Sequence, residues 1–201
     1  MLRETRKQAL KGQIYEEALA LFKAKGFNQV TVEEITQACG IAKGTFYNYF
    51  PRKESILLYL SELQMEATRE RLMATSSNED PKAALLSLFD ALMSRYTSDR
   101  ELVRIMMMEM IRSEPAMAEE LRVMDRFQGM IAQQLKAARA EGKLPASLEC
   151  SNAAAIISGI YFHTLTAWAS SPDDAFDMRT RFKSRFELAW HGIHPTGQQG
   201  G

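Results

Sequence analysis

Apolar residues recur at intervals of three and four positions through most of the chain, which is the pattern of amphipathic α-helices. No stretch shows the alternation of a half-buried strand, and no internal repeat is present. Capping residues, prolines and glycines divide the pattern into segments. We therefore expect an all-α protein of about nine helices, with starts near residues 4, 31, 43, 51, 80, 98, 115, 151 and 171.

The spacing also predicts the segment ends and the inward faces. We expect the first helix to cover 4–25, the fourth to run from Pro51 to about Leu72 and the seventh to end at Gly142, with a polar linker over 75–79. The predicted core side chains include Ile14, Ala18, Leu21, Phe22, Ile35, Ala38, Phe46 and Phe50, and in the seventh helix Met117, Leu121, Met124, Ile131, Leu135 and Ala138. Adjacent acidic pairs such as Glu119-Glu120 diverge around a helix, so they do not form an acid/base dyad.

Residues 31–53 carry the most specific local signals. Thr31 and Glu34 have capping-box spacing, and Gly40 allows a sharp turn after two helical turns. A second short helix, near residues 43–49, then places Phe46 and Phe50 on one face. Two short helices joined by a tight turn match the helix-turn-helix pattern.

Sequence reading of DNA requires side chains that reach base edges, together with donors that hold the helix against phosphate. The outer face of the second short helix offers four candidates for the groove and a glycine that allows close backbone approach: Lys43, Thr45, Tyr47, Asn48 and Gly44. The alternative is that the tyrosines, Tyr49 above all, are only core residues.

The order T-V-E-E-I-x-x-A-x-G-I-A-K-G-T-F-Y-N-Y-F-P-x-K-E resembles the N-terminal signature of the TetR family of bacterial regulators. The resemblance is close over the first quarter of the chain and extends to the rest only in length and helical character. It implies phosphate contacts from Thr31, from Tyr47 or Tyr49, and from Lys53. Ala42 departs from the pattern, because the family often has a capping serine there; this weakens the expected cap.

Charge and composition fit this interpretation. The chain of 201 residues has a formal net charge of zero, but residues 1–56 hold nine Lys/Arg against six Asp/Glu, so a mildly basic head precedes an acidic body. The basic cluster Arg3, Arg6, Lys7 and Lys11 is either a solvated helix end or an arm toward the DNA backbone. The longest uncharged run, 151–172, includes Asn152, His163, Thr164 and Thr166, which favours a buried interface helix over a membrane span. We expect a soluble, cytoplasmic protein without a signal peptide and with no membrane partner.

The body contains a concentration of methionine and aromatic residues that admits two interpretations. One is an ordinary core; the other is a pocket for a small apolar or amphipathic effector, which the family's body domain commonly encloses. The candidate pocket residues are Met106, Met107, Met110, Met124, Phe127, Tyr161, Phe162 and Trp168. Arg104, Glu109 and His163 are candidates to orient such a ligand, or else structural polar residues.

The uncharged eighth helix needs cover on more than one side. Packing the eighth and ninth helices against a second copy would supply it, as the resemblance implies, with an interface of Ile157, Ile160, Tyr161, Leu165, Phe182, Phe186 and Trp190. A monomer that uses the eighth helix as its central core is the alternative.

No phosphate-binding loop or nucleophile motif indicates an enzyme, and we expect no metal or cofactor, since Cys39 and Cys150 lack ligand spacing. His191 and His194 are one turn apart but adjoin a tail, 195–201, that we expect to be disordered. We expect a helix-turn-helix domain over 1–53 and an effector-binding and dimerisation domain over 54–194. The expected function is a homodimeric repressor released from a palindromic double-stranded DNA operator by an effector. A ligand-independent or partner-controlled regulator, or a ligand carrier with a vestigial DNA-binding head, are the alternatives.

Overall fold

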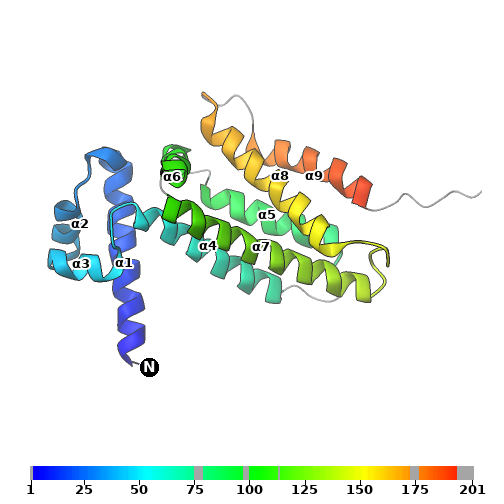
Figure 1. Cartoon of the computed structure of the whole chain (residues 1–201), viewed down its shortest axis with the longest axis horizontal. Helices are drawn as coiled ribbons and strands as arrows, with labels where there is room; N and C mark the ends of the chain where they lie inside the picture. Colours follow the sequence, from blue (N-terminus) through cyan, green and yellow to red (C-terminus); the bar gives the residue numbers. More distant parts are fainter. Residues whose placement is uncertain (1, 75–78, 97–99, 113, 173–176, 194–201) are drawn as a thin grey trace, which may run out of the picture.

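A computed structural model of the chain describes residues 2–74, 79–96, 100–112, 114–172 and 177–193. Within these ranges every regular element is helical, so the predicted all-α class is confirmed. Figure 1 shows a small N-terminal group of helices beside a larger group, with α4 (Ser55–Ala74) leading from the first into the second. No helix among the described residues is long and apolar enough to cross a membrane.

The small group, here called the head, consists of α1 (Leu2–Lys25), the short 3-10 helix η1 (Phe27–Gln29), α2 (Val32–Cys39) and α3 (Lys43–Tyr49). Helix α1 packs against η1 and α2, and α2 packs against α3. Large side chains from every element meet in the core, among them Ile14, Phe22, Phe27, Ile35, Phe46 and Phe50. The predicted turn is confirmed: Gly40 follows α2 with a φ of 67°, a left-handed conformation that glycine adopts without strain.

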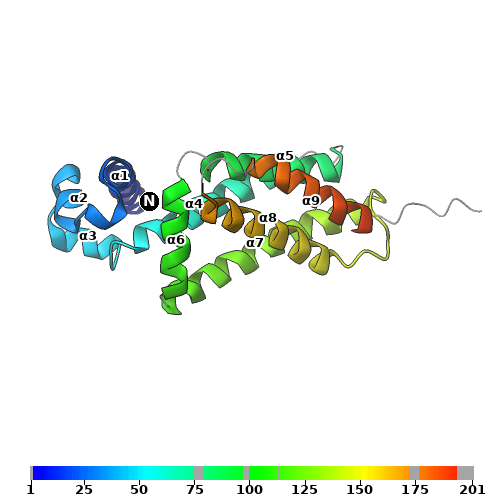
Figure 2. The ribbon, with the colours of Figure 1, turned by 90° about the horizontal axis from the view of Figure 1, so that it is seen from above.

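The larger group, here called the body, adds α5 (Pro81–Tyr96), α6 (Arg100–Arg112), α7 (Glu114–Ala140), α8 (Cys150–Ser170) and α9 (Met178–Ile193) to α4. Helix α7 packs against α4, α6 and α8, and α8 packs against α9. Aromatic rings fill the centre, where the Phe89 centroid lies 4.7 Å from that of Phe182 and 5.8 Å from that of Phe127. Figure 2 shows α6 lying across the other body helices at the end nearest the head.

Two predicted helix starts are wrong. Helix α4 begins at Ser55 rather than at Pro51, because the chain makes bends and turns over 51–54 after Phe50, which is held extended before the proline. Helix α9 begins at Met178, where the Asp177 carboxylate accepts a hydrogen bond from the Thr180 amide at 2.9 Å. The predicted cap there falls partly on 173–176. Those residues, the linker residues 75–78, part of the capping signal at 98–101 and the tail 195–201 lie outside the described residues.

Two predicted core positions are also wrong. Ala38 is exposed and Cys39 takes the inward position on α2, one turn after Ile35. On α7, Leu121 is 55% exposed, whereas Glu120 is only 7% exposed. The first half of α7 is thus rotated from the expected face, because its contacts with α4, α6 and α8 decide which side is covered.

The basic cluster at the start of α1 has one member with a structural role. The Lys11 ammonium lies 3.1 Å from a Glu62 carboxylate oxygen on α4 and 4.0 Å from the centroid of the Tyr59 ring. Lys11 therefore joins α1 to α4, and the interpretation of this residue as part of a DNA arm loses support.

Candidate nucleic-acid interface and body cavity

Helix α3 has a buried side and an outward side. Phe46 is fully buried and Phe50, just after the helix, nearly so. The residues predicted to contact DNA lie on the remaining surface: Lys43, Gly44 and Asn48 are exposed, Tyr47 is 45% exposed, and Thr45 and Tyr49 are half-buried. The two phenylalanines hold α3 against the head, so its basic, amide and aromatic side chains are presented to solvent together.

Gly44 is not required by the packing of the protein itself. A Cβ atom added at this position would meet no protein atom within 4 Å, and the backbone there is ordinary α-helix. The predicted reason for glycine, close approach of an external backbone, remains consistent with this open surface.

The capping box at the start of α2 is formed in full. Thr31 Oγ1 accepts a hydrogen bond from the Glu34 amide at 3.2 Å and donates to Glu34 Oε2, which also accepts from the Thr31 amide at 2.8 Å. Lys25 Nζ donates to Glu34 Oε1 at 2.6 Å; with the bonds from Thr31 this lowers the pKa of the Glu34 carboxyl to about 2. A phosphate contact by the Thr31 hydroxyl would have to replace its bond to Glu34.

Lys43, at the first position of α3, pairs with Glu33 of α2. The hydrogen bond raises the pKa of the Lys43 ammonium and lowers that of the Glu33 carboxyl. Both side chains are largely exposed, so the pair is screened by solvent and readily exchanged. Ala42, the residue before α3, makes no side-chain cap, as the departure from the family pattern predicted.

Lys53 has a different place from the one expected. Its ammonium donates to the backbone carbonyl oxygens of Phe27 and Val30 at 2.7 and 2.8 Å, and lies 4.3 Å from the centroid of the Phe27 ring. These contacts bind the turn before α4 to the connection between α1 and α2. In this arrangement Lys53 is a structural residue of the head, and its predicted phosphate contact is not supported.

Replacing Lys53 by methionine should lower the free energy of unfolding by about 2 kcal/mol, because two backbone carbonyls lose a charged donor. Chemical denaturation of the full chain measures the change. Lys23→Met, at an exposed position of α1, serves as the control. An unchanged unfolding midpoint for Lys53→Met would show that these bonds contribute little.

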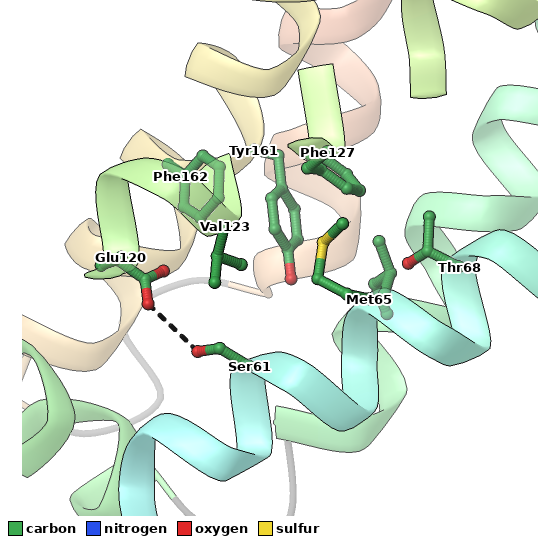
Figure 3. A pocket seen from close by; sticks show the side chains of 9 residues that line it. Ser61, Met65, Thr68, Glu120, Val123, Phe127, Tyr161 and Phe162 are labelled. Atoms are coloured by element: carbon green, nitrogen blue, oxygen red, sulfur yellow. Dashed lines mark hydrogen bonds between the residues drawn. The ribbon is translucent and has the colours of Figure 1, made fainter. Parts of the chain in front are cut away.

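A small cavity of about 30 Å³ lies where α4, α5, α7 and α8 meet. Figure 3 shows its mainly apolar and aromatic lining, which consists of Ser61, Met65, Thr68, Leu92, Glu120, Val123, Phe127, Tyr161 and Phe162. Phe127, Tyr161 and Phe162 were predicted to line a pocket. The sequence did not predict the lining residues Ser61, Met65 and Thr68, because nothing in the sequence of α4 indicated a pocket. It did not predict Glu120 either, because an adjacent pair of acidic residues is typical of an exposed surface.

The other predicted pocket residues do not line this cavity. Trp168 is buried beneath the Arg100 guanidinium, which lies 4.8 Å from its ring centroid. Met106 is in the core, and Met107, Met110 and Met124 are half-buried elsewhere on α6 and α7. Of the expected polar residues, Arg104 pairs with Glu101 at 2.6 Å and His163 contacts Arg185 at 2.9 Å, while the Glu109 side chain is outside the described set.

Glu120 is the charged group of the cavity lining. Ser61 Oγ donates a hydrogen bond to its Oε2 at 3.2 Å, drawn as the dashed line in Figure 3. Burial raises the pKa of the Glu120 carboxyl against this bond, and the neighbouring Glu119 raises it further. Burial therefore makes the charged carboxylate of Glu120 less favourable than it is in water.

The predicted dimer interface needs correction. Six of its seven residues are buried within a single chain: Ile157, Tyr161, Leu165, Phe182, Phe186 and Trp190. Only Ile160 is half-buried. Among the described side chains of α8 and α9, the large apolar ones that are exposed are Ile156, at 52%, and Leu188, at 77%. Both line a shallow depression that also includes Gly159 and Arg185.

The described residues contain no group of three or more histidine, cysteine or acidic side chains that could hold a metal ion. Cys39 is buried and free, and burial raises the pKa of its thiol, so nothing in its surroundings favours the reactive thiolate.

A helix-turn-helix head with an outward-facing basic and aromatic helix, joined by one helix to a larger helical body with a small cavity, is an arrangement that suits DNA binding by the head. Residues 14–60 match the family model described as bacterial regulatory proteins, tetR family. This match supports the assignment of the chain to the TetR family.

Three similar proteins illustrate the family. The chain is 30% identical to the regulator TcmR of Streptomyces glaucescens over 65% of its length, and 25% identical to the fatty acid metabolism regulator protein of Bacillus subtilis, covering 90% of this chain and 94% of that one. The structure of Thermus thermophilus FadR, a transcriptional repressor in complex with lauroyl-CoA, superposes with a TM-score of 0.73 at 26% identity, covering 95% and 98% of the two chains. For two curated relatives, TcmR among them, the match spans only 61% and 33% of their length.

Proposed function

We propose that the protein is a homodimeric transcriptional repressor that binds a palindromic DNA operator and is released by a small-molecule effector. The observation that supports DNA binding best is α3, where a buried Phe46 and Phe50 support an outward row of Lys43, Thr45, Tyr47 and Asn48. We keep the proposed division into a DNA-binding domain over 1–53 and an effector-binding and dimerisation domain over 54–194.

In the proposed complex α3 enters the major groove and its neighbours hold the phosphates. Lys43 exchanges its Glu33 partner for DNA, Gly44 permits close approach, and Tyr47 or Tyr49 donates to phosphate oxygen. Two heads related by dimer symmetry would read half-sites about 34–36 Å apart, or a multiple of one helical turn.

For dimerisation, the outer faces of α8 and α9 are the proposed surface. Ile156 and Leu188 are large apolar side chains left exposed on adjacent helices, and the small Gly159 lines the same depression. A second copy related by twofold symmetry would cover both and form a four-helix arrangement of α8 and α9 with their copies.

The proposed effector site is the cavity bounded by α4, α5, α7 and α8. Its present volume of about 30 Å³ is enough for only one or two water molecules, so an effector must enlarge it. Since α4 is also the connection to the head, its displacement would alter the distance between the two recognition helices. An effector shifts the equilibrium between the present and the enlarged state of the cavity only if it binds the enlarged state more tightly.

The small cavity also favours a second candidate, a regulator of this fold that responds to no ligand. Lauroyl-CoA is the ligand of Thermus thermophilus FadR, and fatty thioesters are therefore a class to compare in effector screens. A repressor that stays bound to its operator in the presence of every ligand class in the screen would favour the second candidate.

Selection of binding sites from a random duplex library by the purified full chain, repeated at two salt concentrations, tests the DNA-binding proposal. We expect an enriched inverted repeat at both concentrations, with affinity that falls as salt rises. Weak binding that shows steep salt dependence and enriches no sequence would contradict a specific operator.

A further inference from the structure

Glu120 lies at a buried position, where an ionised carboxyl group raises the free energy of the folded protein. It is only 7% exposed, it is surrounded by apolar and aromatic side chains, and it accepts a hydrogen bond from the neutral Ser61 hydroxyl. No lysine, arginine or histidine belongs to the described lining of the cavity. A buried carboxylate normally has a cationic partner, and the described residues that line the cavity include none, so this position suits a positive group supplied by a ligand.

The rings around Glu120 favour the same sign of charge. Phe127, Tyr161 and Phe162 meet one another with centroid separations between 5.2 and 6.1 Å, and together they line the cavity across from α4. The faces of aromatic rings attract cations, so rings and carboxylate act together. An anionic group in the same place would be repelled by the carboxylate.

The route from solvent shows no excess of positive charge. A groove between α4 and α7 adjoins the cavity and shares Met65 with it. Its charged side chains are Glu62, Glu66, Arg69 and Arg126, two of each sign, and Arg69 is paired with Glu66. A polyanionic head group such as that of an acyl thioester of coenzyme A would find no net attraction there. Met65 has three flexible side-chain bonds and can move aside for an apolar chain.

We infer that the cavity takes an apolar molecule bearing a protonated amine, with the ammonium group hydrogen-bonded to Glu120 between the aromatic rings and the apolar chain displacing Met65. This deepens the proposed effector response and rests on it. Glu120 is then the specificity-determining residue of the site. The ammonium group of the ligand would offset the cost of burying an ionised carboxylate, which has no cationic neighbour in the described lining of the cavity.

Calorimetric titration with three molecules of equal chain length tests the inference: decylamine, decan-1-ol and decanoyl-CoA. The wild-type protein should bind decylamine about tenfold or more tightly than decan-1-ol, and decanoyl-CoA least tightly. Glu120→Gln should remove the advantage of the amine and leave the affinity for the alcohol unchanged. Glu141→Gln is the matched control, since that exposed side chain pairs with Lys143 at 2.9 Å just after the end of α7 and should alter neither affinity.

Two results would overturn the inference. One is tightest binding of decanoyl-CoA by the wild-type protein; the other is an equal loss of amine and alcohol affinity in Glu120→Gln, which would mark a purely structural role. Operator binding by the ligand-free wild-type protein is measured separately. If no operator is found, the proposed function fails while the titrations still decide the ligand class; if the operator is bound and the amine is not preferred, only the present inference fails.

Discussion

Replacing Lys43 and Tyr47 together by alanine is expected to lower operator affinity by at least about 100-fold while the protein stays folded and dimeric. Each is an outward side chain of α3, and a good side-chain contact to a base or phosphate contributes about 1–3 kcal/mol. Neither belongs to the support of the helix, which depends on Phe46 and Phe50. Fluorescence anisotropy with the selected operator measures the loss, and the salt dependence should become shallower because a cation has been removed.

Two comparisons separate this effect from a general change in charge. Lys136→Ala removes one positive charge from an exposed position of α7 in the body and should leave the operator affinity unchanged. Glu33→Gln frees Lys43 from its ion pair and should strengthen DNA binding modestly, since the exchange of partners is no longer needed. Unchanged affinity in the double alanine variant would refute α3 as the recognition helix.

The second large effect is expected at the proposed dimer surface. Replacing Ile156 and Leu188 together by glutamate should convert the protein into a monomer, because four carboxylates would have to be buried in a symmetric interface. Arg185 lines the same depression, but it is already hydrogen-bonded to His163 and Thr164 and cannot offset this number of buried charges. Since both positions are exposed in the single chain, the fold of each protomer should persist. Analytical ultracentrifugation measures the mass, and circular dichroism the helix content.

Leu121→Glu is the matched control. Leu121 is an apolar residue, 55% exposed, on α7 rather than on α8 or α9, so its replacement should leave the dimer intact.

The monomeric variant with glutamate at positions 156 and 188 should also lose most of its operator affinity, since only one half-site is then bound at a time. A dimer that survives the double glutamate substitution would place the interface on another apolar surface, such as the one with Met108 and Ile111.

The head could be predicted almost completely from sequence. Thr31 and Glu34 form the capping box, Gly40 makes the left-handed turn, and α3 covers Lys43–Tyr49 with Phe46 inside. These features depend on residues a few positions apart, whose hydrogen bonds and steric limits act within a single turn. The role of Lys53 could not be predicted, because its two carbonyl partners lie 23 and 26 positions away in the chain.

The sequence predicted the helices of the body, but it predicted less well which face of each helix is buried. Apolar periodicity identified α7, yet Leu121 and Met124 indicated one face for its first half, and the structure buries Glu120, Val123 and Phe127 instead. The same uncertainty affected α8 and α9, where the residues predicted for a dimer interface are the core of one protomer. A helix with apolar residues on several sides can be covered on any of them.

By itself, the sequence determined the helical class, most helix boundaries, the helix-turn-helix unit and the outward row on α3. Only the tertiary structure decided which side of each body helix is inside, where the cavity lies, that Glu120 and Ser61 meet across 59 positions of sequence, and that Ile156 and Leu188 remain uncovered. The physical reason is the range of the interactions. Capping and turn chemistry act locally, whereas the rotation of a helix about its axis is selected by the summed packing of all its neighbours.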